Sequence, residues 1–334
     1  METQNQTPHI LLDPYRGDAR PPHNLVGIIA LACFFCATAV VTFVYFRESL
    51  QQRAIIVQNP VAPTIPIIPN AFSTLSLSAR SVYVYDIRSN KELFAKEPDT
   101  PLPLASLTKV ATALAVSDVL SPQSQIRIPR YLGAPGRPEH LSQGDIWKTS
   151  DVLTFTLVVS SNDGAQFLAD TADSALHAKY PESPTASTTV WRMNKFAHDL
   201  ELTNTIFYNT NGLDLDLTHA GAYGSARDVA RLFAYAASTS SDVFSGTSQD
   251  TLVLTSVNGK KTTIFNTDHA LESIPSIIVG KTGLTDLAGG NLAIVFDAGP
   301  GRRIIAVVLG STKEGRFEDM KKLVSTTLQV LQDH

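Results

Sequence analysis

The sequence predicts an α+β fold, in which early and late strands join one sheet and a block of helices lies between them in the chain. Two alternating segments, Ser81–Ile87 and Glu92–Lys96, have the period of strands and are separated by a short turn at Ser89-Asn90. Apolar helical segments follow, and three more strand-like segments lie near the C-terminus. Strands at both ends of a helical block are typical of an α+β domain whose sheet is completed late in the chain.

The helices of the middle block begin with a segment that is apolar on nearly every side, which indicates burial inside a larger domain. This helix runs from Val110 to Leu120, and Pro101 and Pro103 stand just before it, where proline suits a helix entry. The other predicted helices are Asp151–Val159, started by Thr149 or Ser150, a helix that begins at Ala165, Trp191–Leu200, Ser225–Ala237 and a closing helix at about Phe317–Leu331.

The late strands are preceded by a predicted hairpin. Residues 251–267 alternate on both sides of Asn258-Gly259, which is a strong signal for a tight hairpin turn. Residues 123–147 are rich in proline and glycine and are expected to form irregular strand and loop. The last three predicted strands are Ile277–Lys281, Asn291–Phe296 and Arg303–Leu309. We assign residues 75–334 to one domain.

The residues before this domain fall into three segments. Residues 1–24 are polar and are expected to be a disordered tail, whereas residues 25–46 carry no charge and are long enough to cross a bilayer. Residues 47–74 contain a proline at every third position from Pro60 to Pro69, the period of polyproline II, and are expected to form a linker of about 3.1 Å per residue.

We interpret residues 25–46 as an uncleaved transmembrane helix. A cleaved signal peptide would need an apolar region of only about 7–15 residues, and a lipoprotein cleaved before Cys33 would need a better match than Ala30-Leu31-Ala32. Arginines flank the segment on both sides, so the distribution of charge does not orient it.

The composition excludes several classes of function. The formal net charge is −4 and no basic tract occurs, so no nucleic-acid partner is expected. Both cysteines, Cys33 and Cys36, lie in the apolar segment, which leaves no disulfide or cysteine metal site in the later domain. The histidines lack metal-ligand spacing and no phosphate-binding loop is present, so we expect no metal and no cofactor.

Ser106-Leu107-Thr108-Lys109 is the stretch with the clearest chemistry. Ser106 lies near the predicted start of an apolar helix, and Lys109 follows three residues later on the same face. Burial and the positive end of the helix dipole both disfavour an ammonium there, so Lys109 can be neutral near pH 7 and accept a proton from Ser106. A helix cap and a surface lysine would explain the same four residues.

Two further motifs follow in order. Ser160-Ser161-Asn162 interrupts the apolar pattern between two helices, where a polar run is typical of a functional site and also of a plain helix cap. Lys281-Thr282-Gly283 ends the predicted strand that begins at Ile277. Ser-x-x-Lys and Lys-Thr-Gly each occur once, and the three motifs in this order are typical of penicillin-binding proteins and class A β-lactamases.

The chain resembles the D-alanyl-D-alanine carboxypeptidases, the low-molecular-weight penicillin-binding proteins of peptidase family S11. The segments that carry the resemblance span roughly residues 75–312 and are Pro103–Lys109, Ser160–Asp163, Thr205–Asp214, Ser225–Asp228 and Gly280–Thr285. The resemblance implies a serine β-lactamase/DD-peptidase-like fold, with a five-stranded antiparallel sheet flanked by helices, a helical subdomain, and the active site between them.

The resemblance and the chemistry of the residues agree on the roles within the site. Ser106 is the expected nucleophile and Lys109 its base, Ser160 relays a proton, and Asn162 orients the substrate carbonyl and Lys109. Lys281 and Thr282 are expected to bind the terminal carboxylate of the substrate, and Gly283 lets the substrate backbone lie along the strand. By family position, the backbone N–H groups of Ser106 and Leu284 form the oxyanion hole. Thr285 completes the predicted substrate-binding residues.

These assignments predict a D-Ala-D-Ala carboxypeptidase that acts on peptidoglycan stem peptides and is acylated by β-lactams. With the transmembrane helix, they place the catalytic domain outside the cell membrane. A DD-endopeptidase is the first alternative, followed by a β-lactamase, for which Glu201-Leu-Thr-Asn204 is one residue shorter than the expected deacylation motif. A catalytically idle penicillin-binding protein is the last. Leu284 departs from the polar residue of well-known family members, which leaves the substrate preference open.

Overall fold

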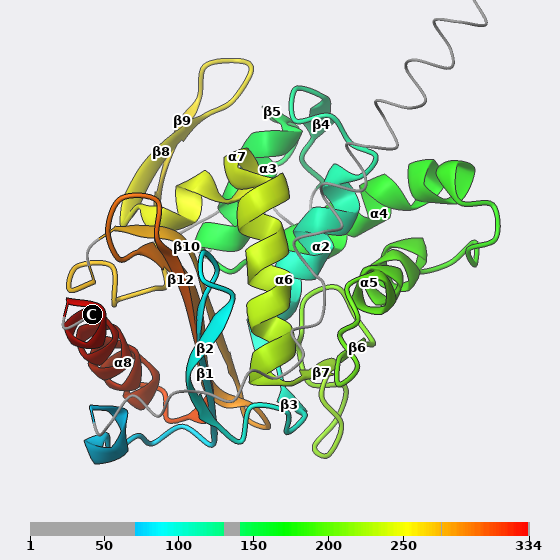
Figure 1. The fold of residues 1–334 in the computed structure, drawn as a ribbon. Helices are drawn as coiled ribbons and strands as arrows, with labels where there is room; N and C mark the ends of the chain where they lie inside the picture. Colours follow the sequence, from blue (N-terminus) through cyan, green and yellow to red (C-terminus); the bar gives the residue numbers. More distant parts are fainter. Residues whose placement is uncertain (1–70, 130–140, 275, 333–334) are drawn as a thin grey trace, which may run out of the picture. The chain divides into compact units, whose positions relative to one another are not determined.

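A five-stranded antiparallel sheet organises the part of the chain that the structure describes (Figure 1). The computed structural model describes residues 71–129, 141–274 and 276–332, all within one compact unit. The strand order is β10-β11-β12-β1-β2, so the early strands join the late ones where β1 pairs with β12. The strands are β1 (Ser81–Asp86), β2 (Lys91–Lys96), β10 (Ile277–Thr285), β11 (Gly289–Asp297) and β12 (Arg303–Ser311). This arrangement confirms the predicted α+β fold.

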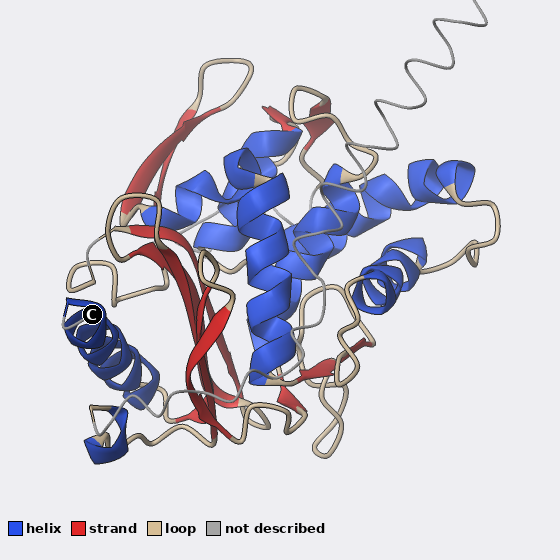
Figure 2. Ribbon diagram, in the orientation of Figure 1, coloured by secondary structure: helices blue, strands red, loops and turns tan. Residues whose placement is uncertain are grey.

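Helices cover both faces of the sheet (Figure 2). Helix α8 (Gly315–Gln332) packs against β11 and β12, and helix α6 (Ala226–Thr239) packs against β1, β11 and β12 from the other side. Because both faces are covered, β11 and β12 are almost continuously buried. Strands that are buried on both faces have nearly continuous apolar sequences, as these two do. Strand β2 lies at an edge, where Lys91 and Lys96 are exposed at its two ends and discourage pairing with another chain.

Helix α2 (Thr108–Ser117) is the buried centre of the helical block. Every residue from Thr108 to Val116 is buried, which explains why this helix is apolar on nearly every side. It packs against α3, α4, α5 and α6. The remaining helices are η2 (Phe72–Thr74), η3 (Ala105–Leu107), α3 (Thr149–Val158), α4 (Asn162–Lys179), α5 (Thr188–Asp199), α7 (Ser241–Phe244) and η4 (Ser245–Ser248).

Several boundaries differ from the predicted ones. Strand β10 does not end at Lys281 but continues to Thr285, because its last residues still pair with the start of β11. Helix α4 begins at Asn162 and not at Ala165, because the Ser161 hydroxyl caps it by accepting from Gly164 N. The predicted hairpin is confirmed as β8 (Thr251–Thr255) and β9 (Lys261–Phe265). The strand expected within residues 123–147 is present as the short pair β4 (Gln125–Arg127) and β5 (Ile146–Lys148). Short strands that the sequence did not indicate are β3 (Leu102–Pro103), β6 (Ile206–Phe207) and β7 (Ala222–Gly224).

The predicted tail, transmembrane helix and most of the linker lie outside the described residues. Within the described ranges, no helix has both the length and the apolar character that crossing a membrane requires.

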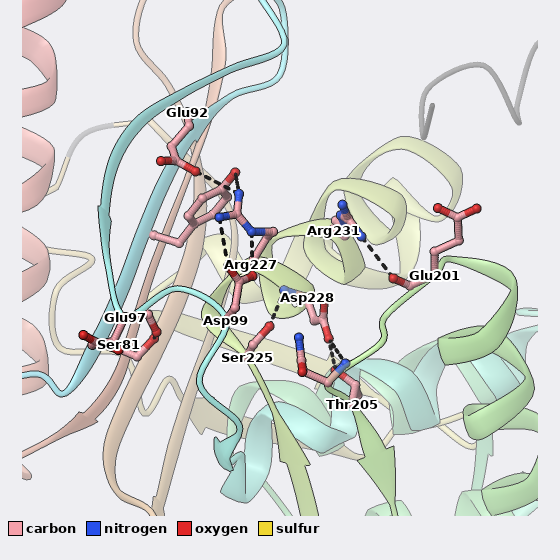
Figure 3. Close-up of polar contacts among 12 residues, drawn as sticks. Ser81, Glu92, Glu97, Asp99, Glu201, Thr205, Ser225, Arg227, Asp228 and Arg231 are labelled. Atoms are coloured by element: carbon pink, nitrogen blue, oxygen red, sulfur yellow. Dashed lines mark hydrogen bonds and ion pairs between the residues drawn. The ribbon is translucent and has the colours of Figure 1, made fainter. Parts of the chain in front are cut away.

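Helix α6 is fastened at its first turn to a loop of the helical block (Figure 3). Ser225 caps the helix by accepting from Asp228 N at 3.1 Å. The Asp228 carboxylate in turn accepts from Asn204 N at 2.8 Å and from Thr205 Oγ1 at 3.0 Å. These bonds fix the segment that leads into β6 and the loop after it.

Arg227 fastens the same turn to the sheet (Figure 3). Its guanidinium donates to both carboxylate oxygens of Asp99, at 2.7 and 3.2 Å, and to Glu92 at 2.8 Å. It also lies over the ring of Tyr83 and donates to the Tyr83 hydroxyl at 2.9 Å. One side chain therefore connects α6, β1, β2 and the loop that leads to Ser106.

We expect Arg227→Ala to lower the free energy of unfolding by about 1–2 kcal/mol, because a bidentate pair, a second carboxylate and a cation–π contact are lost together. Lys195→Ala is the matched control, since Lys195 forms a single exposed pair with Asp199 on one helix and should cost no more than about 0.5 kcal/mol. Urea unfolding of both variants measures the difference. Equal effects would show that the Arg227 cluster does not stabilise the fold.

Candidate active site

Ser106 lies in the short helix η3, which leads directly into α2. The residue before it, Ala105, has a φ of 49°, a left-handed conformation that is unfavourable for alanine and is held here by its surroundings. Asn291 on β11 donates its side-chain amide to Pro103 O at 2.9 Å and to Leu104 O at 3.1 Å. The sheet thus holds the strained turn that presents Ser106.

Lys109 lies one helical turn after Ser106 and is 1% exposed. Its Nζ is 2.7 Å from Ser106 Oγ, 2.7 Å from Asn162 Oδ1 and 2.8 Å from the backbone oxygen of Asn211. Burial, and after it the charge of Lys281, lowers the pKa of Lys109 well below its usual range.

An ammonium could donate to all three oxygens, but burial disfavours the charged form, and a neutral amine fits the same contacts. Such an amine has two N–H donors and one lone pair, and the oxygens of Asn162 and Asn211 can only accept. The two carbonyl oxygens therefore take both N–H groups of Lys109. The lone pair is left for the Ser106 hydroxyl, which can donate its proton along the remaining 2.7 Å contact.

Ser160 and Asn162 lie at the break between α3 and α4, and each faces a different lysine. Ser160 has a φ of 59° and its Oγ accepts from Lys281 Nζ at 2.9 Å. Asn162, at the start of α4, accepts from Lys109. The polar interruption that the sequence shows between two apolar helices is therefore the segment that connects the two lysines.

Lys281 lies within β10, at the edge of the sheet, and is 2% exposed. Besides Ser160, its ammonium contacts the backbone oxygen of Thr282 at 3.0 Å. Burial lowers the pKa of Lys281 to about 7; Asp268 opposes this shift and Arg316 adds to it. The group is therefore close to the point at which it gains or loses its charge at neutral pH.

The rest of the third motif is held by its neighbours. The Thr282 hydroxyl lies 2.7 Å from Thr267 Oγ1. A Cβ on Gly283 would come within 2.8 Å of Leu104 O, so glycine lets β10 pass close to the segment before Ser106. Leu284 is 44% exposed, and Thr285 Oγ1 donates to Asp214 Oδ1 at 3.0 Å.

The structure thus brings Ser106, Lys109, Asn162, Ser160 and Lys281 into one region, through the contacts at the two lysines. Thr282 and Gly283 adjoin this region on β10, whereas Leu284 and Thr285 lie further along the strand. The N–H groups of Ser106 and Leu284 remain predicted oxyanion donors. No group of three or more potential metal ligands occurs among the described residues.

Residues that the motifs did not indicate complete the site. The carbonyl of Asn211 faces Lys109. Asp214 connects the same loop to the end of β10 and the turn after it, by accepting from Thr285 Oγ1 and Leu287 N. Both residues lie in the Thr205–Asp214 segment, which the family resemblance indicated as part of the site. The resemblance did not indicate that a backbone oxygen of this segment contacts Lys109. Arg316 on α8 donates to Gly283 O at 2.7 Å, and nothing in its local sequence indicates that role.

Comparison with known proteins identifies the family. The family model for D-alanyl-D-alanine carboxypeptidase, peptidase S11, matches residues 68–313. The chain belongs to this family.

Individual relatives agree with this assignment. The D-alanyl-D-alanine carboxypeptidase DacF of Bacillus subtilis is 28% identical over 274 residues, which cover 78% of this chain and 65% of DacF. A D-alanyl-D-alanine endopeptidase of Pseudomonas aeruginosa is 31% identical over 159 residues, or 47% of this chain and 46% of that relative. The chain thus aligns with slightly less than two thirds of the length of DacF.

The fold of this S11 family member is that of the penicillin-binding proteins. Penicillin-binding protein D2 from Listeria monocytogenes, solved in its cefotaxime-bound form, is 29% identical and superposes with a TM-score of 0.62. The match covers 76% of this chain and 98% of that structure.

Gly212, which follows Asn211 in the same loop, allows a test of how closely this loop packs against the turn before Ser106. It has a φ of +78°, and a Cβ there would lie 1.9 Å from Ala105 O. We expect Gly212→Ala to lower the free energy of unfolding by about 3 kcal/mol or more, because the loop must move away from the turn before Ser106.

Gly259→Ala is the control, since Gly259 has a φ of +85° but nothing lies within 4 Å of a Cβ there. That substitution should lower the free energy of unfolding by only about 1 kcal/mol, because only the left-handed conformation is unfavourable for alanine there. Thermal or urea unfolding compares the two. A similar loss of unfolding free energy in both variants would mean that the loop does not pack tightly against the turn before Ser106.

Proposed function

We propose that the protein is a serine D-Ala-D-Ala carboxypeptidase, which removes the last D-alanine from peptidoglycan stem peptides through an acyl-enzyme. The setting of Lys109 carries this proposal, because it places a buried amine with a strongly lowered pKa 2.7 Å from a serine hydroxyl. Membership of the S11 family supports the same substrate.

The first step is acylation. Ser106 Oγ attacks the carbonyl carbon of the peptide bond between the two D-alanines, and its proton passes to Lys109 Nζ at 2.7 Å. The negative charge on the carbonyl oxygen is stabilised by the N–H groups of Ser106 and Leu284, each typically worth about 3–4 kcal/mol. The carbon–nitrogen bond then breaks, and the leaving amine receives a proton relayed through Ser160.

Recognition of the terminal carboxylate is the task of β10. The Lys281 ammonium and the Thr282 hydroxyl provide a charge and a donor at the same end of the site. Because β10 is an edge strand and Gly283 has no side chain, a substrate backbone can lie beside it as an added strand. Leu284 presents an apolar and partly exposed side chain at this end.

The second step is deacylation. Water adds to the ester carbonyl, the bond to Ser106 Oγ breaks, and the serine recovers its proton as the shortened peptide leaves. A β-lactam would acylate Ser106 by the same attack, with ring opening in place of loss of D-alanine. The cefotaxime- and ampicillin-bound forms of the Listeria protein support β-lactams as covalent inhibitors of this site.

The purified protein should release D-alanine from a synthetic pentapeptide that ends in D-Ala-D-Ala, and a fluorescent penicillin should label it covalently. We expect Ser106→Ala to abolish labelling and to lower kcat/KM by a factor of about 10⁴ or more. Ser161→Ala is the matched control, because Ser161 caps α4 through Gly164 and should keep both activities.

The products, identified by mass, decide between the related activities. Cleavage of a cross-linked muropeptide dimer in preference to the pentapeptide would assign the protein to the endopeptidases, as some relatives are named. Rapid turnover of penicillin with no peptide cleavage would indicate a β-lactamase. Labelling that persists in Ser106→Ala would refute the nucleophile.

We further propose that residues 25–46 anchor the protein in the cell membrane and that the catalytic domain lies on the extracytoplasmic side. The uncharged run supports the anchor, and the location of peptidoglycan outside the membrane supports the orientation. The proline-rich residues 47–74 would act as the spacer between anchor and domain.

The full-length protein should therefore remain with membranes after a carbonate wash, whereas a variant lacking residues 1–47 should be released into the soluble fraction and still bind penicillin. Intact mass of the membrane-bound protein reports whether the segment is cleaved. Recovery of the full-length, uncleaved protein in the soluble fraction would contradict the anchor.

A further inference from the structure

Exposed apolar side chains gather in one segment beside the candidate active site. Among the residues that the structure describes, nine large apolar side chains are exposed, and five of them lie between residues 206 and 217. A sixth, Leu284, directly follows the third motif. Single exposed apolar residues need no explanation, but a cluster of this kind is typical of a surface that binds a ligand or partner.

Three leucines of this segment alternate with two aspartates and form what we call the leucine strip: Leu213, Leu215 and Leu217. The two carboxylates are engaged within the protein. Asp214 is bonded to the end of β10 and the turn after it, as described above. Asp216 accepts from Thr218 N at 2.7 Å and from His219 N at 2.9 Å. The side chains of the leucines are left exposed to solvent.

The backbone of the leucine strip is held in place by its own loop. Leu213 N donates to Asn211 Oδ1 at 3.0 Å, and Leu213 O accepts from Asn209 Nδ2 at 2.9 Å. Leu215 N donates to His219 O at 2.7 Å. A surface that is fixed before binding loses little conformational freedom when a ligand arrives.

The leucine strip adjoins the open edge of β10. Gly280 N donates to the Thr247 hydroxyl at 3.1 Å, so the backbone of this residue faces away from β11. Backbone groups of alternate residues in a strand face the same side, so those of Thr282 and Leu284 also face the open edge. The contact of Lys281 Nζ with Thr282 O agrees with this orientation.

A substrate strand at this edge must run antiparallel to β10. Its carboxyl end lies at Lys281 and the carbonyl that is attacked lies at the predicted donor Leu284 N, so its earlier residues extend toward Thr285. The penultimate D-alanine is then opposite Leu284, and the residue before it is opposite Thr285. Directly opposite residues project their side chains to the same face, and Thr285 projects to Asp214, within the leucine strip.

We infer that the leucine strip is a subsite for a long aliphatic side chain on the residue that precedes D-Ala-D-Ala. This inference rests on the proposed carboxypeptidase function and adds to it the part of the peptide, besides the D-alanines, that the enzyme selects. The strip contacts the methylene groups of the side chain and leaves its far end in water. A charge at that end is tolerated, since long charged side chains can lie along apolar surface with their charged group solvated.

The charged groups at this end of the site are engaged or solvated. Asp214 and Asp216 are bonded as described, and His219 Nδ1 lies 2.8 Å from Asp216 Oδ2. Asp286, in the turn after β10, is exposed, and an ion pair at such a position contributes little. The leucines are therefore the feature of this surface that can select a side chain.

Three synthetic peptides test the subsite: Nα-acetyl-X-D-Ala-D-Ala with alanine, norleucine or lysine at X. Norleucine extends the alanine side chain by three methylenes and carries no charge. On an open surface each methylene should raise kcat/KM roughly two-fold, so the norleucine peptide should exceed the alanine peptide by about ten-fold. The lysine peptide should lie within about three-fold of the norleucine peptide.

Leu213→Ser and Leu215→Ser each remove one exposed side chain of the leucine strip. We expect each to lower the norleucine-to-alanine ratio of kcat/KM to about three, and the double variant to bring it close to one. Val253→Ser is the matched control, because Val253 is an exposed apolar residue of the separate β8–β9 hairpin. The control should keep the ratio of about ten.

A binding measurement separates this inference from the proposed function. In Ser106→Ala labelled with 13C-methyl leucine, the norleucine peptide should shift the Leu213 and Leu215 methyl signals, which are assigned by their loss in the two serine variants. The Kd of this peptide should be about ten-fold lower than that of the alanine peptide. The measurement needs no turnover, so it decides the inference even if the wild-type protein releases no D-alanine.

Equal kcat/KM for the alanine and norleucine peptides, in a protein that does release D-alanine, would overturn the inference. So would a ratio that survives the double variant, or leucine methyl signals that stay unmoved throughout the titration. A lysine peptide that is strongly preferred over norleucine, with the preference lost in Asp286→Asn, would also overturn it. In that case a charge, and not the leucine strip, would select the side chain.

Discussion

The burial of two lysines is the constraint on which the site depends. Lys109 and Lys281 are 1% and 2% exposed, and removal from water destabilises the charged form of each. A lysine on a flexible surface would recover its solvation by moving outward. Here α2 lies at the centre of the helical block and β10 belongs to the main sheet, so neither side chain can leave without disturbing packed structure.

The fold supplies this rigidity from segments far apart in the chain. Asn291 on β11 holds the turn before Ser106, and Arg227 connects α6 with the strands beside that turn. Ala105, which precedes the nucleophile candidate Ser106, and Ser160, which accepts from Lys281, both have left-handed conformations. Such conformations persist where surrounding contacts determine them, as the bonds from Asn291 do for the turn before Ser106.

The features that could be predicted from the sequence are those that depend on residues close to one another in the chain. The Ser106–Lys109 contact follows from helical spacing, and the β1–β2 and β8–β9 pairs follow from alternation around a turn. The Asn211 carbonyl and the Arg316 contact with Gly283 arise from tertiary packing, and a backbone oxygen leaves no mark on residue type. The end of β10 was misplaced for a similar reason: polar residues at Lys281 and Thr282 interrupt the apolar pattern while the backbone pairing continues.

Burial lowers the pKa of both lysines, but the proposed mechanism needs Lys109 neutral and Lys281 charged. The contacts of Lys109 are to a hydroxyl, an amide oxygen and a backbone oxygen, so its neighbours offer dipoles and no negative charge, and Lys281 adds repulsion. Lys281 is buried as deeply, yet it lies in the field of Asp268. Deprotonation of Lys109 also removes a positive charge that would otherwise disfavour the Lys281 ammonium. Each lysine therefore favours the protonation state that the proposed mechanism assigns to the other, so that one buried region can hold a base and a cation side by side.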